Sequence, residues 1–144
     1  MGNLFLRHGE VQNEKDVFYA NLPGFYLSSK GEKQAKDAAK KIKKLFNIEK
    51  IITSPLLRAR QTASIVNEEL KTDIDVSYNI IEWSGPYEWI GKTIEEIKLT
   101  DSFKNYNNNP LNLKNTLESL KNVDDRCNLD LSLIHISEPT RPDV

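Results

Sequence analysis

The chain has 144 residues, 38% hydrophobic and 28% charged, which is enough for one globular domain with a core. Its net charge of −1 gives no reason to expect nucleic acid or an anionic membrane as a partner, and no apolar run reaches transmembrane length. One cysteine and two histidines exclude an internal disulfide and argue against a zinc site, so we expect a cytoplasmic protein without metal or other cofactor.

The chain begins with a predicted strand, a loop and a helix. Residues 3–7 (Asn-Leu-Phe-Leu-Arg) predict a buried strand, and residues 11–28 form a long loop of the kind that is usually functional. Ser28 or Ser29 is a helix cap, and Glu32 completes the pattern of a capping box. The predicted helix carries apolar residues at helical spacing, namely Ala35, Ala38, Ala39, Ile42 and Leu45.

Strands and helices continue to alternate after this helix. Residues 48–53 predict a second strand, Ser54-Pro55 begins a second helix because proline suits a first turn, and residues 74–78 predict a third strand. The later elements are a short helix over residues 93–99, a polar loop over 105–110 and a helix over 113–129. This alternation predicts an α/β fold with a mainly parallel sheet.

Chemically active side chains follow the predicted strands. Arg7 and His8 follow the first strand, Arg58 lies in the first turn after the second, and Glu82 follows the third. Ligands of parallel sheets bind beyond the carboxyl ends of the strands, so we expect these side chains to converge on one anion. An arginine fork binds phosphate, a neutral imidazole attacks phosphorus, and a carboxyl group protonates a leaving oxygen.

Each of these residues also has a plain structural interpretation. Taken alone, His8 is better interpreted as a core histidine that hydrogen-bonds to the backbone, and Arg60 fits a solvent-facing position on its helix. Glu10 and Glu88 compete with Glu82 for the role of the acid. The order of the four chemically active residues along the chain is what favours the functional interpretation.

Five segments extend this pattern. They are Leu6-Arg7-His8-Gly9-Glu10, which holds the RHG motif; Leu27-Ser28 with Gly31 and Gln34-Ala35; Ser54-Pro55 with Arg58-Ala59 and Thr62-Ala63; Glu82 with Gly85, Trp89, Gly91 and Glu95-Glu96; and Glu118-Ser119-Leu120 with Val123 and Arg126. Together they resemble the histidine phosphatase superfamily, also called phosphoglycerate mutase-like. The resemblance implies a three-layer α/β/α fold with a mainly parallel sheet.

The resemblance also implies roles for individual residues. His8 would be the phosphate-accepting nucleophile, Arg7 and Arg58 would bind the phosphate, and Glu82 would be the general acid. Asn13 is a further candidate for ligand contact, although its spacing from His8 is looser than in mutases. No metal is implied, because the arginines supply the electrostatic stabilisation.

The implied activity is hydrolysis of a phosphorylated small molecule through a phosphohistidine intermediate. The loop after His8 resembles phosphatase-type members more than glycolytic mutases. Two alternatives stay open, namely phosphoglycerate mutase-type transfer and a module that binds phosphorylated ligands or proteins without turnover. Neither the substrate nor the oligomeric state follows from the sequence.

One part of the family pattern is missing. The family has a second histidine on a later strand that ends in a Val-Ser-His-Gly-like sequence, whereas His135 lacks a following glycine and comes too soon after Arg126. Residues 131–141 (LSLIHISEPTR) resemble the translation of a transposase-type sequencing adapter. We therefore expect residues 1–130 to be the N-terminal part of a histidine phosphatase domain, incomplete at its C-terminus, and residues 131–144 to be non-native. Such a chain is expected to be nearly inactive by itself.

Overall fold

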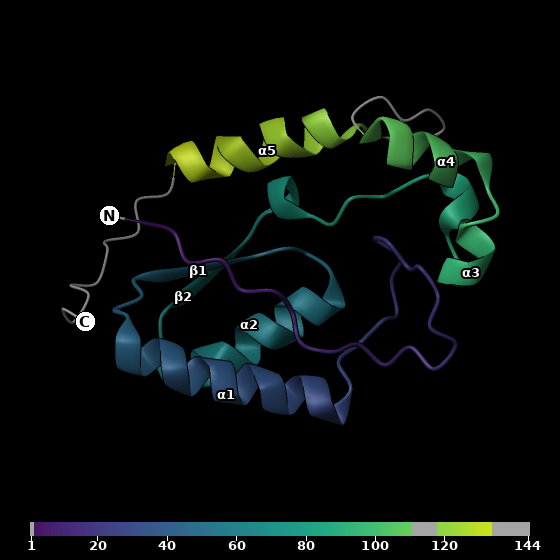
Figure 1. Cartoon of the computed structure of the whole chain (residues 1–144). Helices are drawn as coiled ribbons and strands as arrows, with labels where there is room; N and C mark the ends of the chain where they lie inside the picture. Colours follow the sequence, from purple (N-terminus) through teal and green to yellow (C-terminus); the bar gives the residue numbers. More distant parts are fainter. Residues whose placement is uncertain (1, 111–117, 134–144) are drawn as a thin grey trace.

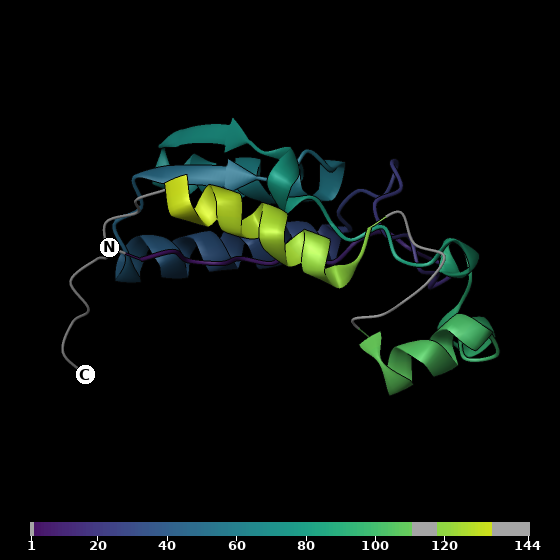
Figure 2. The same ribbon diagram turned by 90° about the horizontal axis from the view of Figure 1, so that it is seen from above.

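The computed structural model describes residues 2–110 and 118–133, which form helices around a parallel sheet (Figure 1). The elements are α1 (Ser29–Leu45), β1 (Lys50–Thr53), α2 (Leu57–Leu70), β2 (Asp73–Val76), the 3₁₀ helices η1 (Tyr78–Ile80) and η2 (Tyr87–Trp89), α3 (Ile94–Ile97), α4 (Asp101–Asn108) and α5 (Leu120–Leu133). Helices α1 and α2 lie on one side of the sheet and α5 on the other (Figure 1), and the view from above shows α5 over β1 and the N-terminal segment (Figure 2). The predicted α/β class with a parallel sheet is confirmed.

Helix α1 begins where the sequence predicts. The hydroxyl of Ser28, its N-cap, accepts a hydrogen bond from the Gly31 N–H at 3.1 Å, which satisfies one of the free donors of the first turn. Ala35, Ala39 and Ile42 are buried where α1 packs against α2, while the lysines face outward. The small alanine side chains let the two helices approach closely.

The sheet is formed by β1 and β2, joined through α2. The strands pair in parallel, with Ile51 opposite Ile74 and Thr53 opposite Val76. Helix α2 begins at Leu57, so Ser54-Pro55 precedes the helix and does not start it as predicted. The reason is that the Ser54 hydroxyl accepts from the Leu56 N–H at 3.3 Å, which makes a turn before the first helical residue.

The N-terminal segment departs most from expectation. Residues 3–7 form no strand, and Leu4, Phe5 and Leu6 are 40%, 76% and 46% exposed, so the prediction of a buried strand is wrong. The segment still runs extended beside the sheet, but a strand needs a backbone partner and no described residue supplies one. An apolar cavity of about 470 Å³ separates residues 3–8 from β1. We call this space the apolar cavity.

We expect the 144-residue chain to bind the dye ANS and to self-associate as its concentration rises. The cause is the exposed apolar side chains beside the open apolar cavity, which other chains or a dye can cover. Replacing Phe5 with serine should lower both signals several-fold. Leu99→Ser is the matched control, because Leu99 is 84% exposed and lies after α3. A chain that stays monomeric by light scattering and binds no dye would contradict this expectation.

The later helices correct one prediction. The short helix over 93–99 is confirmed by α3, but residues 105–108 are the second half of α4 and not a loop. Thr100 caps α4, and Tyr106 packs edge-on against Trp89 with ring centroids 5.6 Å apart, so capping and packing outweigh the low helix propensity of asparagine.

The last predicted helix overlaps α5. The sequence predicts it over residues 113–129, of which 113–117 lie outside the described residues; α5 begins at Leu120 and continues to Leu133. His135 also lies outside the described residues. Over the described ranges, no helix is both long enough and apolar enough to cross a membrane.

Candidate active site

His8 lies at the end of the N-terminal segment, and the backbone orients its half-buried ring. The ring Nδ1 is 2.8 Å from the carbonyl oxygen of Gly9. Because a carbonyl oxygen only accepts hydrogen bonds, Nδ1 carries a proton in this contact. In the neutral ring with this tautomer, the lone pair that could attack a ligand is on Nε2.

The backbone of this loop packs directly against two helices. The buried Gly9 N–H donates to the Thr62 hydroxyl at 3.1 Å, and that hydroxyl donates to the carbonyl oxygen of Arg58 at 2.8 Å. On the other side, a Cβ atom added to Gly31 would lie 2.1 Å from the carbonyl oxygen of Glu10. The position of the histidine loop thus depends on the absence of a side chain in the first turn of α1.

Gly31→Ala is expected to lower the free energy of unfolding by about 1–3 kcal/mol, the usual cost of overpacking. The direction of the change in unfolding free energy is informative, because a glycine-to-alanine change inside a helix ordinarily stabilises a protein by roughly 0.5–1 kcal/mol. Urea unfolding followed by circular dichroism measures the change. Lys33→Ala, an exposed substitution on the same helix, should stay within about 0.5 kcal/mol. A stabilised Gly31→Ala chain would show that the helix and loop do not pack this closely.

Arg58 is buried, with 1% of its surface exposed, in the first turn of α2. Its Nη2 donates to the carbonyl oxygen of Ala20, and its guanidinium lies over the Tyr19 ring at 4.6 Å from the centroid. Burial lowers the pKa of Arg58, while electrostatic interactions with Tyr19 and Glu82 oppose that shift. The Phe25 ring stacks on the Tyr19 ring, with centroids 4.7 Å apart. The long loop over residues 11–28 therefore holds this arginine in place.

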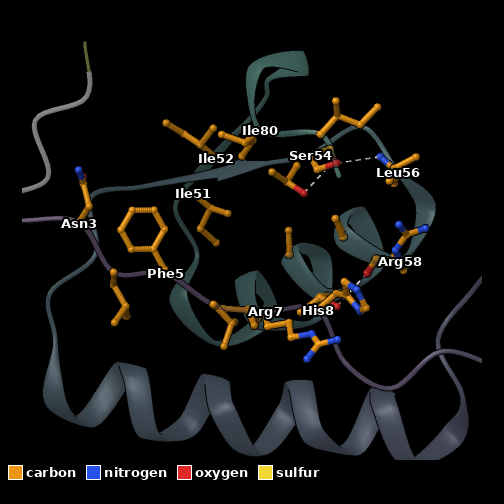
Figure 3. A pocket seen from close by; sticks show the side chains of 18 of the residues that line it. Asn3, Phe5, Arg7, His8, Ile51, Ile52, Ser54, Leu56, Arg58 and Ile80 are labelled. Atoms are coloured by element: carbon orange, nitrogen blue, oxygen red, sulfur yellow. Dashed lines mark hydrogen bonds between the residues drawn. The ribbon is translucent and has the colours of Figure 1, made fainter. Parts of the chain in front are cut away.

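Arg7 differs from Arg58 in being exposed. It forms no hydrogen bond or ion pair with any other residue that the structure describes, so its five N–H donors are available to a ligand. Arg7, His8 and Arg58 lie at the same end of the apolar cavity (Figure 3). Arg7 and His8 also line a second, polar cavity of about 560 Å³. The two cavities thus meet at the histidine.

Glu82 is exposed and follows η1. Its Oε1 accepts a hydrogen bond from the backbone N–H of Trp83 at 2.9 Å. It lines the apolar cavity together with His8 and Arg58, and its charge acts on the pKa of Arg58. The carboxylate therefore belongs to the same cavity lining as the histidine and the buried arginine.

The two rival acids have other partners. The carboxylate of Glu10 forms an ion pair with Lys30 at 3.4 Å and accepts from the Ser28 hydroxyl at 3.0 Å. Glu88 accepts hydrogen bonds from the backbone N–H and the hydroxyl of Ser102 and lines neither cavity. The geometry favours Glu82 over both.

Asn13 lines the polar cavity, but its side chain already has backbone partners. Its Nδ2 donates to the carbonyl oxygen of Val17 at 2.9 Å, and its Oδ1 accepts from the Val17 N–H at 3.2 Å. These bonds close the turn in which Asp16 has a φ of +50°. Each amide atom retains one further hydrogen-bonding position, so a ligand contact would share Asn13 with the turn.

The structure adds residues that the sequence predictions do not assign to the site. Thr62, which holds the Gly9 N–H, follows Arg58 by one helical turn, and that spacing is a signal the sequence contains. Tyr19 contacts Arg58 from a distant loop, and no local pattern indicates such a contact. The described residues include no cluster of three or more His, Cys, Asp or Glu side chains that could hold a metal ion.

Comparison with known proteins agrees with this arrangement. The model of the histidine phosphatase superfamily (branch 1) matches residues 4–139. The match continues beyond Asp130, and the expected end of the native sequence there stays a prediction. PhoE of Bacillus subtilis, an uncharacterized phosphatase, is 30% identical over 139 residues, which cover 94% of this chain and 65% of PhoE.

Solved structures show the same fold. A mycobacterial glucosyl-3-phosphoglycerate phosphatase in complex with VO3 superposes with a TM-score of 0.76 at 23% identity, over 88% of this chain and 63% of that one. The alpha-ribazole phosphatase of Shigella flexneri gives a TM-score of 0.71 at 19% identity, with coverages of 88% and 63%. This chain thus spans less than two thirds of the length of each of these three relatives.

Proposed function

The chain belongs to the histidine phosphatase superfamily, and from that membership we propose that its site hydrolyses phosphomonoesters through a phosphohistidine on His8. One observation carries the proposal. His8, whose Nδ1 is held by the Gly9 carbonyl, lies at the same end of one cavity as the buried Arg58 and the unpaired Arg7. A nucleophile between two phosphate-binding cations is suited to phosphoryl transfer.

The proposed reaction has two steps. In the first, Nε2 of His8 attacks phosphorus, the bond to the ester oxygen breaks, and Glu82 donates a proton to that oxygen. Arg7 and Arg58 stabilise the negative charge on the non-bridging oxygens. In the second step, the Glu82 carboxylate takes a proton from water, the water attacks phosphorus, the N–P bond breaks and inorganic phosphate leaves.

The substrate is proposed to be a phosphorylated small molecule. Two relatives of the same fold are named for such substrates, glucosyl-3-phosphoglycerate and alpha-ribazole phosphate esters. Mutase-type transfer and phospho-ligand binding without turnover are the alternatives. Slow turnover by the 144-residue chain itself is part of the proposal, because His8 is the single histidine among the described residues and the apolar cavity beside it is open.

The test is a single-turnover experiment with 4-nitrophenyl phosphate and the protein in excess. We expect one equivalent of 4-nitrophenolate and a phosphoryl label on the protein that is stable in base and labile in acid, as phosphohistidine is. Arg60→Ala is the matched control, since Arg60 is exposed on the same helix as Arg58. Phosphate binding without 4-nitrophenolate would favour the binding module, and an acid-stable label would exclude a histidine nucleophile.

A further inference from the structure

We propose that Arg126 and Glu118 are positioning residues for the acid, because they hold the chain immediately before and immediately after Glu82. Arg126 binds the carbonyl oxygen of Ile81, and Glu118 binds the ring of Trp83. This inference rests on the proposed function, in which Glu82 protonates the leaving oxygen. It assigns a role to α5 and to the residues just before it, which contribute no reacting group.

Arg126 uses most of its donors in this contact. Its Nε and Nη2 donate to the two carboxylate oxygens of Glu118 at 2.8 and 2.9 Å. Nη2 also donates to the carbonyl oxygen of Ile81, and Nη1 donates to that of Asn79, each at 2.6 Å. The side chains of Arg126 and Glu118 are only 15% and 23% exposed, so solvent screens the pair less than it screens a surface ion pair.

Glu118 completes the contact with its backbone. Its carbonyl oxygen accepts a hydrogen bond from Nε1 of Trp83 at 3.0 Å, while the N–H of Trp83 donates to the carboxylate of Glu82. The hydrogen bonds that Arg126 donates to Glu118 raise the pKa of Arg126, and the charge of Glu82 adds a smaller contribution in the same direction. The carboxylate of the acid is therefore held through both of its chain neighbours.

The segment that carries Glu82 needs this support. It leaves β2 through η1, a single 3₁₀ turn without a buried residue, and the Glu82 side chain itself is exposed. Helix α5 packs against η1 from the side opposite to α1 and α2. A general acid must lie within about 2.6–3.2 Å of the oxygen it protonates, so a small displacement of this segment removes its contribution.

The first test exploits the leaving group. 4-Nitrophenolate leaves without a proton, whereas the oxygen of phenyl phosphate needs one, so a displaced acid slows the second ester only. In single turnover, Arg126→Gln should slow phenol release by about 10–100-fold and 4-nitrophenolate release by less than about 3-fold. The double variant with Glu82→Gln should be no slower than Glu82→Gln alone. Lys121→Ala, exposed on the same helix, is the control and should change neither rate.

The second test does not need activity. The indole N–H of Trp83 bonds to Glu118, and that of Trp89 bonds to the Ser102 hydroxyl at 3.0 Å. The two rings meet edge-on with centroids 6.1 Å apart, so their indole signals report on two different hydrogen bonds within one aromatic cluster. In Arg126→Gln we expect solvent exchange of the Trp83 indole to speed up at least about tenfold by NMR, with Trp89 unchanged; global opening would change both. Arg126→Lys keeps the charge but not the planar fork of donors, so its Trp83 indole should exchange at a rate between those of the parent chain and Arg126→Gln.

The outcomes separate the positioning role of Arg126 and Glu118 from the proposed function. Equal slowing of both esters, or an unchanged Trp83 signal, overturns the positioning role. Equal changes at Trp83 and Trp89 overturn it too, because Arg126 would then support the wider aromatic cluster and not the segment of Glu82 in particular. If the unsubstituted chain releases no 4-nitrophenolate, the proposed function fails, and the indole signals still decide whether Arg126 and Glu118 hold this segment.

Discussion

Replacing His8 with alanine is expected to lower the single-turnover release of 4-nitrophenolate by at least about 10³-fold and to remove the phosphoryl label from the protein. The nucleophile cannot be replaced by a neighbour, because the described residues contain no second histidine and the ring is oriented by its own bond to the Gly9 carbonyl. The absorbance of 4-nitrophenolate measures the rate, and the phosphoryl label left on the protein after acid or base treatment measures the covalent intermediate.

The matched controls for this variant test its specificity. His8→Gln keeps a polar side chain without an imidazole nitrogen and should be as inactive as His8→Ala. Both variants should keep the unfolding transition of the parent chain, since His8 is only partly buried and its one bond is to the next residue. 4-Nitrophenolate release that survives either change would mean that another residue attacks phosphorus.

Arg58→Met is expected to lower 4-nitrophenolate release by about 10²–10³-fold, the usual cost of losing one donor that stabilises transition-state charge. Its effect on stability should be small or favourable. The guanidinium is buried and its burial lowers the pKa of Arg58, so the folded chain bears the cost of desolvating a charge. Methionine fills a similar volume against Tyr19 without that charge.

Two measurements on the same protein check this expectation. Release of 4-nitrophenolate gives the loss of function, and urea unfolding gives the free energy of unfolding, which should change by less than about 1 kcal/mol or increase. Arg60→Met, exposed two residues later on the helix, should change neither quantity. A fall in stability of several kcal/mol would show that Arg58 mainly supports the loop that contains Ala20.

Local signals in the sequence were sufficient for several elements. Ser28 identifies the start of α1 because a serine hydroxyl satisfies the first free N–H groups wherever the helix packs. The alternation of apolar runs locates β1 and β2, and their carboxyl ends lead directly to Arg58 and Glu82. These inferences held because each depends on residues within a few positions of one another.

The same reasoning failed where a partner was needed. The apolar pattern of residues 3–7 indicates a strand, but a strand also needs backbone partners, and the described residues leave an apolar cavity there. Residues 105–108 look like a loop by composition, and the Thr100 cap together with the packing of Tyr106 on Trp89 makes them helical.

Residue type and spacing are local properties, and they were enough to predict the fold class, the helix and strand order from α1 to β2, and His8, Arg7, Arg58 and Glu82 as candidates. How these residues are held depends on the tertiary structure. The Tyr19 ring over Arg58 and the hydrogen bonds from Arg126 to the carbonyls before Glu82 join distant parts of the chain. Contacts of this kind form when packed elements meet, and no spacing along the chain encodes them.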